Sequence, residues 1–175
     1  TLVAAWFSGD HEEASGCAIV FATLKNGSNS WSNAVTLAKR DGFSNQNPVL
    51  YHDSGTNVLH LFHSQAAANS GEDHAEIWHL ESNDGGDSWS ESKPWYTTPG
   101  SFPRNRIIPL PSAESSPSSC VLFPFYSASR SNSHFDDQNW SIMGQNCNLS
   151  SNVSLETSAG WVMKNVEESA YLVQP

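Results

Sequence analysis

The stretch Ser82–Ser90, SNDGGDSWS, decides the fold that the sequence predicts. Shifting the chain by 58 residues places Asn26–Ser32, NGSNSWS, on Asp84–Ser90, DGGDSWS, because 26 + 58 = 84. A turn that recurs with Asn26 in place of Asp84 does not depend on a catalytic carboxylate. Asp and Asn both accept hydrogen bonds from nearby backbone N–H groups, and glycine supplies positive φ. We therefore interpret Asp84 as the residue that holds a turn together.

A second element recurs along the chain: LVAAWFS (2–8), VLHLFHS (58–64) and VLFPFYS (121–127). The unit is about 60 residues long, and we divide the chain at 1–56, 57–119 and 120–175. Its apolar stretches are short, rich in β-branched and aromatic residues, and separated by turn-forming residues. No helical apolar period is sustained. An all-β repeat of this length is typical of a propeller blade, and the chain is long enough for about three.

Composition excludes some classes of function and favours a compartment. The net charge is −10, with 18 acidic and 8 basic residues, which argues against a nucleic-acid partner. No apolar run approaches the ~18–20 residues of a membrane-spanning helix. Three cysteines leave at least one unpaired if a disulfide forms. Four N-glycosylation sequons favour a secreted or lumenal protein: Asn26, Asn139, Asn148 and Asn152.

SNDGGDSW (82–89) is similar to the Asp box, Ser-x-Asp-x-Gly-x-Ser/Thr-Trp, of the sialidase (neuraminidase) superfamily, also called the bacterial neuraminidase repeat. LKNGSNSW (24–31) resembles a degenerate copy, and TSAGW (157–161) a weaker third. The resemblance implies a six-bladed β-propeller of sialidase type, of which this chain covers about three blades. Half a ring would leave sheet edges open, so we expect the chain to be part of a longer protein. The matching positions of the structural motif are Ser82, Asp84, Gly86, Ser88 and Trp89.

The resemblance also implies chemistry. Sialidases hold the substrate carboxylate with three arginines, which bind it in a bidentate way. A tyrosine acts as nucleophile, and an aspartate on a loop of the first blade acts as acid/base. Here the loop Ser8–Gly16, SGDHEEASG, follows the first predicted inner strand. Glu12 best fits the family's W-x-x-G-x-x-E spacing, so Glu12 and Asp10 are the predicted catalytic residues, beside Glu13. The alternative is an ordinary solvated acidic loop.

Two arginines flank Asn105 in FPRNRIIPL (102–110), which resembles the family's Arg-Ile-Pro motif. We expect Arg104 and Asn105 to contact substrate. Strand alternation would turn Arg106 the other way. The alternative is a surface pair that supports the loop.

Ring-bearing and amide side chains end the predicted inner strands. His63 and Tyr126 occupy equivalent repeat positions, and Gln65 lies beside His63. Rings at one level suit stacking on a sugar face, so we predict that all three bind substrate. The rings equally suit a packing layer between blades.

No cofactor is predicted. His60 and His63 are three residues apart on a strand and point to opposite faces, so no metal site is predicted either. Gln174 stands near the place where the resemblance implies a glutamate that activates the tyrosine, and an amide cannot act as that base. Three functions therefore remain open, all with a glycan partner: an exo-glycosidase on sialic acid or a related acidic sugar, a catalytically silent glycan-binding propeller, and a polysaccharide lyase on uronic acids.

Overall fold

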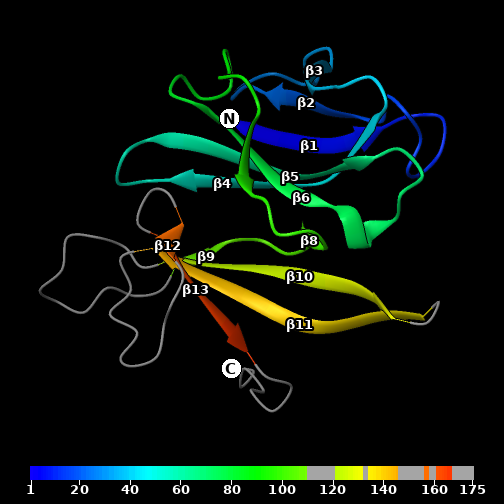
Figure 1. Ribbon diagram of the computed structural model, residues 1–175. Helices are drawn as coiled ribbons and strands as arrows, with labels where there is room; N and C mark the ends of the chain where they lie inside the picture. The colour runs from blue at the N-terminus through cyan, green and yellow to red at the C-terminus, as the bar shows by residue number, and fades with distance from the viewer. Residues whose placement is uncertain (110–120, 132–133, 146–155, 158–160, 167–175) are drawn as a thin grey trace, which may run out of the picture.

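The computed structural model describes residues 1–109, 121–131, 134–145, 156–157 and 161–166. Across these ranges the chain forms β-strands and a single 3-10 turn, η1 (Glu72–His74), which confirms the predicted all-β class. The strands build three antiparallel sheets that stack one above another (Figure 1). In the described part of the chain, no helix is long and apolar enough to span a membrane.

Sheet 1 has the order β1-β2-β3, with β1 (Leu2–Ser8), β2 (Ala18–Leu24) and β3 (Val35–Ala38). Sheet 2 has the order β4-β5-β6-β7, with β4 (Phe43–Asp53), β5 (Val58–Ala67), β6 (Glu76–Ser82) and β7 (Lys93–Tyr96). Sheet 3 has the order β12-β13-β11-β10-β8, and β9 also pairs with β10. Its strands are β8 (Ser101–Pro103), β9 (Ile108–Pro109), β10 (Val121–Ser131), β11 (His134–Gln145), β12 (Glu156–Thr157) and β13 (Trp161–Val166).

The three repeated apolar stretches begin equivalent strands: β1, β5 and β10. We expected these strands to be the inner, first strands of their units. In sheets 2 and 3, earlier strands pair with the repeated one: β4 pairs with β5, and β8 and β9 both pair with β10. In sheet 1 the repeated strand, β1, lies at the edge beside β2. The predicted division at residues 56 and 57 accordingly falls in the turn between β4 and β5. A repeat period gives the length of a unit but not which strand begins it.

Sheet 2 lies between sheets 1 and 3. Because side chains alternate along β5, this strand contributes apolar residues to both faces of sheet 2. Leu61 packs toward sheet 1 with Ile19 and Leu80. Phe62 packs toward sheet 3 with Phe123 and its neighbours. A strand that is buried on both faces needs apolar residues at successive positions, which explains the run in VLHLF.

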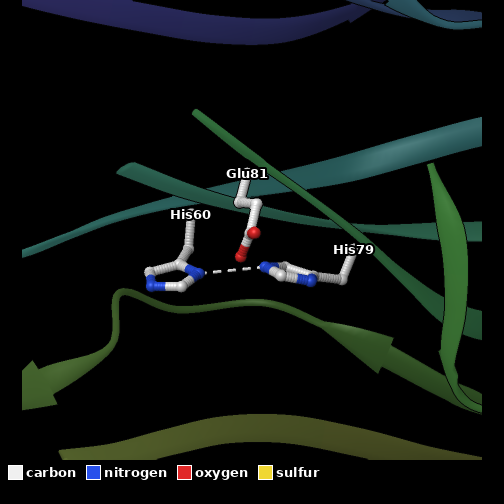
Figure 2. A group of neighbouring side chains, drawn as sticks. All are labelled: His60, His79 and Glu81. Carbon is white, nitrogen blue, oxygen red and sulfur yellow. Dashed lines mark hydrogen bonds between the residues drawn. The ribbon is translucent and has the colours of Figure 1, made fainter. Parts of the chain in front are cut away.

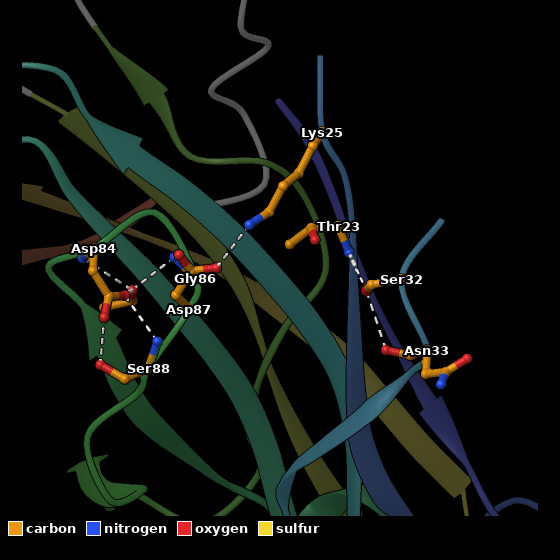
Figure 3. Close-up of polar contacts among 9 residues, drawn as sticks. Thr23, Lys25, Ser32, Asn33, Asp84, Gly86, Asp87 and Ser88 are labelled. Atoms are coloured by element: carbon orange, nitrogen blue, oxygen red, sulfur yellow. Dashed lines mark hydrogen bonds and ion pairs between the residues drawn. The ribbon is translucent and has the colours of Figure 1, made fainter. Parts of the chain in front are cut away.

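The 58-residue repeat is visible in the hydrogen bonds of the two related turns. Ser32 N donates to Thr23 O at 2.8 Å, and Thr23 N donates to Ser32 Oγ at 3.0 Å. Ser90 N donates to Glu81 O at 2.9 Å, and Glu81 N donates to Ser90 Oγ at 3.0 Å. Because 23 + 58 = 81 and 32 + 58 = 90, the same pair of bonds closes both turns. The turns lie side by side, joined by the ion pair of Lys25 and Asp87 (Figure 3).

Within the second turn, the Asp84 carboxylate is fully engaged by its neighbours (Figure 3). Its Oδ1 accepts from Ser82 Oγ at 2.7 Å and from Ser88 N at 2.9 Å, and its Oδ2 accepts from Ser88 Oγ at 2.5 Å. The hydrogen bonds from Ser88, followed by the one from Ser82, lower the pKa of Asp84 well below its ordinary range. Gly86 N also donates to Ser82 Oγ at 2.8 Å. The Asp84 carboxylate therefore stabilises its own turn.

Candidate functional site

The ends of the β5–β6 hairpin differ in character. Leu59 pairs with Ser82 at the end that carries the Asp84 turn, and Gln65 pairs with Glu76 at the other end. At that second end lies a small cavity of about 20 Å³, whose polar lining comes from several loops and strands. A volume of that size holds about one water molecule. Its polar residues are Glu13, Ser44, Gln46, Asn47, Ser64 and Glu72.

Two polar atoms at this cavity have no hydrogen-bond partner among the described residues. They are Ser44 Oγ and Gln46 Nε2, and both side chains are buried. Buried polar atoms in native proteins are almost always paired. The cavity therefore offers a donor and a hydroxyl to a water molecule or a polar group that enters it.

A larger groove of about 370 Å³ adjoins the cavity. One wall comes from β4 (Asn47 to Leu50), and the other from the segment that follows β8 (Pro103 to Arg106). Asn47 lines both the groove and the cavity, so the two meet at this residue. Asn47 has φ 50° at a register shift between Gln46 and Val49. Asparagine tolerates this left-handed backbone better than most residues, and the bulge re-aims its side chain.

The predicted substrate residues Arg104, Asn105 and Tyr126 lie at or beside this groove. Arg104 and Asn105 line it, and the Arg104 guanidinium carbon lies 5.1 Å from the Tyr126 ring centroid. Arg106 lines the same groove. The prediction that Arg106 faces away is wrong, because residues 104–107 are not a strand and alternation does not apply. All three groove residues from Arg104 to Arg106 are exposed, and they give this wall two guanidinium groups.

The carboxylates of the loop between β1 and β2 differ in their exposure to solvent. Asp10 and Glu12 are exposed and line neither the cavity nor the groove. Glu13 is half-buried, has φ 63° and lines the cavity. Its carbonyl oxygen accepts a hydrogen bond from Asn69 N at 3.1 Å, which ties the loop to the β5–β6 connection. The structure therefore brings Glu13, rather than Glu12, toward Asn47.

His63 is fully buried and lines neither space. Its Nε2 lies 2.8 Å from Ser92 Oγ, and its Nδ1 lies 3.1 Å from Ser64 O. Burial lowers the pKa of His63 to about 4. A neutral imidazole whose two nitrogens both have partners suits the alternative stated for His63, a ring that packs between blades.

Gln65 is also buried and belongs to a chain of polar contacts between strands. Its Oε1 accepts from Arg40 Nη1 at 3.1 Å, and its Nε2 donates to Asn45 Oδ1 at 2.9 Å. Asn45 Nδ2 then donates to Cys17 O at 2.9 Å. Arg40 also stacks on Phe43, with its guanidinium carbon 3.7 Å from the ring centroid. This relay connects sheets 1 and 2 beneath the loops that form the cavity.

The sequence analysis missed one group of side chains, His60, His79 and Glu81 (Figure 2). In the register of β5 and β6, His60 lies opposite Glu81, and His79 lies opposite Phe62. Burial lowers the pKa of His79 to about 4 and also lowers the pKa of His60. The spacing of His79 and Glu81, two residues apart on one strand, was the available signal. Their partner on β5 depends on the pairing register, which residue spacing does not reveal.

Several predicted features lie outside the described residues. They include Gln174, Cys120, Cys147, the sequons at Asn148 and Asn152, and the centre of the third turn motif at 158–160. Within the described residues, Cys17, which directly precedes β2, is a free and buried thiol.

Comparison with protein families identifies the family of the chain. The model of the BNR repeat-like domain matches residues 1–161. A search of the curated proteins found no match.

Proposed function

Because the chain belongs to the family of BNR repeat-like domains, which is found in sialidase-like proteins, we propose that it takes part in binding and hydrolysing an acidic glycan. In this proposal, the three stacked sheets are blades of a six-bladed sialidase-type propeller. The groove between sheets 2 and 3 holds a terminal sialic acid or a related acidic sugar. The exposed sequon at Asn26 fits a secreted or lumenal protein.

One observation carries the proposal: Arg104 and Arg106 line the same groove as Asn47 and Asn105. A guanidinium group presents planar paired donors that match a carboxylate. The two amide side chains add donors and acceptors for the hydroxyl and acyl groups of a sugar. In the part of the chain that the structure describes, neither arginine forms an ion pair with a carboxylate. Both guanidinium groups therefore remain available to an anionic ligand.

Glycoside hydrolysis also needs a group that protonates the leaving oxygen. Glu13 and Glu72 line the cavity that meets the groove at Asn47. We assign the proton-transfer role to Glu13, since Glu12 and Asp10 are exposed and line neither space. This revises the choice made from residue spacing while keeping the same loop.

The test uses the full-length protein with Arg104→Gln and Arg106→Gln. Binding of an α-sialoside is measured by calorimetry, and hydrolysis is measured with a fluorogenic sialoside. Each substitution removes charge-assisted hydrogen bonds worth about 1.5–3 kcal/mol, so we expect at least a tenfold weaker Kd. Lys93→Gln, which removes an exposed positive charge from β7, is the matched control. Unchanged sialoside binding in both arginine variants would contradict the proposal.

Binding without hydrolysis is the second candidate. The observation in its favour is that, among the described residues, no carboxylate lines the groove itself; Glu13 and Glu72 line the adjoining cavity. A folded wild-type protein that binds sialoside through Arg104 and releases no fluorophore would identify a glycan-binding domain. Release of products that absorb in the ultraviolet from uronic polysaccharides would instead identify a lyase.

A further inference from the structure

Three potential metal ligands converge on the face of sheet 2 that packs toward sheet 3. His60 is on β5, and His79 and Glu81 are on β6. Alternation places Phe62 on this face with them, and the Phe62 and His79 rings stack at 4.6 Å. None of the three residues lines the groove or the cavity, so this cluster is separate from the proposed glycan site.

The geometry already approaches that of a coordination shell. His60 Nδ1 and His79 Nε2 lie 3.0 Å apart, and the Glu81 carboxylate is directed at this pair of nitrogens (Figure 2). One ligand atom from each of the three residues lies within 4.8 Å of the others. Ligands at about 2.0–2.2 Å from one tetrahedral ion are separated by slightly more than 3 Å. The ion requires only small side-chain adjustments and takes the place of the proton that the two rings share.

We propose that His60, His79 and Glu81 form a binding site for Zn²⁺, with a fourth position open to water. Two imidazoles and one carboxylate form a donor set that zinc uses when it keeps an open position. All three side chains are half-buried, so ligands are held in place while an ion can still enter.

Carboxylates and an aromatic ring lie near His60. Glu81 and Asp53 both act electrostatically on His60, and the Asp53 carboxylate is fixed by bonds from Gly55 N at 2.8 Å and Thr56 Oγ1 at 2.8 Å. The Tyr51 ring stacks on His60 with centroids 6.1 Å apart, which restrains the orientation of the imidazole. The bound ion would link β5 to β6 and so raise the stability of sheet 2.

The experiment titrates Zn²⁺, and then Co²⁺ as a spectroscopic probe, into the full-length chain produced without a histidine tag and stripped of metal. Calorimetry gives the stoichiometry and Kd, and a melting curve gives the change in Tm. The variants are His79→Gln and Glu81→Gln. Glu81→Gln keeps the side-chain volume and leaves the two rings in place. His52→Gln is the control, because His52 is an exposed histidine of the same sheet that lies outside the cluster, with its Nε2 3.2 Å from Asn57 Oδ1.

We expect one equivalent of metal to bind to the wild type and to His52→Gln, with a raised Tm and the visible bands of four-coordinate Co²⁺. Loss of a ligand should weaken this equivalent by about 100-fold or more, since even outer-shell partners contribute 10–100-fold. Absence of binding to folded wild-type protein overturns the proposal. So does binding that survives unchanged in both His79→Gln and Glu81→Gln. Neither result depends on sialoside binding. The zinc site can therefore be disproved without affecting the proposed glycan function, and the glycan function can be disproved without affecting the zinc site.

Discussion

The rings of Phe21 and Trp89 form a T-shaped contact across the boundary between sheets 1 and 2, with centroids 5.1 Å apart and planes at 75°. Phe21 is fully buried on β2, and Trp89 ends the turn that Asp84 organises. Gly86 lies against the same ring: a Cβ added there would be 2.6 Å from Phe21 Cζ. The turn is therefore also a sheet-to-sheet contact. Trp31, its equivalent in the first turn, is 47% exposed.

This contact predicts a difference between adjacent glycines. Gly85 and Gly86 both have positive φ, but an added Cβ at Gly85 meets nothing within 4 Å. We expect Gly86→Ala to lower the free energy of unfolding by about 1–3 kcal/mol more than Gly85→Ala, because of overpacking against Phe21. Chemical denaturation followed by tryptophan fluorescence measures both. Phe21→Leu should reduce the excess cost of Gly86→Ala, and equal costs for the two glycines would contradict the packing argument.

Asp84→Ala should lower Tm and leave glycan affinity unchanged. The substitution leaves Ser88 N, Ser88 Oγ and Ser82 Oγ without the acceptor that they now share. The control is Asp87→Ala in the same turn, since the Asp87 side chain makes an exposed ion pair with Lys25 at 3.7 Å, which contributes little to stability. A large loss of sialoside affinity at unchanged Tm would place function in the turn after all.

Stability should fall as the pH is lowered from 6.5 to about 4. The unfolded chain protonates His63 near pH 6.5, whereas burial lowers the pKa of His63 in the folded protein to about 4. Between these values only the unfolded state binds the proton, so acid favours unfolding. His63→Gln should flatten this part of the curve of Tm against pH, measured with a chelator present. His79 titrates in the same direction, so part of the slope should remain.

Glu13→Gln should lower turnover of the fluorogenic sialoside by about 100-fold or more, the usual contribution of a positioned acid or base. Glu12→Gln should leave turnover within a few-fold of wild type, because Glu12 is exposed and lines neither space. Both substitutions preserve volume, and Tm checks that the loop is intact. A loss of turnover with Glu12→Gln alone would restore the choice based on spacing.

Local patterns predicted the elements well. The strands β1, β5 and β10 begin at the first residues of the repeated apolar stretches 2–8, 58–64 and 121–127. The 58-residue shift correctly related the two turns, because a repeated turn must close the same backbone bonds. The order of strands within a sheet was not predicted, since the repeat period does not indicate which strand begins a unit.

The candidate site depends on contacts between sheets, and the sequence predicted only some of the residues that make these contacts. Arg104 and Asn105 were predicted because two arginines flank Asn105 in a short motif, and Tyr126 was predicted from its repeat position. The orientation of Arg106 was wrong, because the strand breaks after Pro103. His60 and Glu81 became neighbours through the β5–β6 register. That register is set by hydrophobic packing against two other sheets, which a single sequence does not specify residue by residue.

The positions of Leu59 opposite Ser82 and of Gln65 opposite Glu76 separate the two ends of the β5–β6 hairpin. One end keeps adjacent sheets together, and the other carries the loops around Asn47. Randomising the groove-side loops would therefore alter the proposed glycan site and leave the scaffold intact. A fluorescent label at Asp87, on the opposite rim, would report on the recombinant protein without occupying its ligand site.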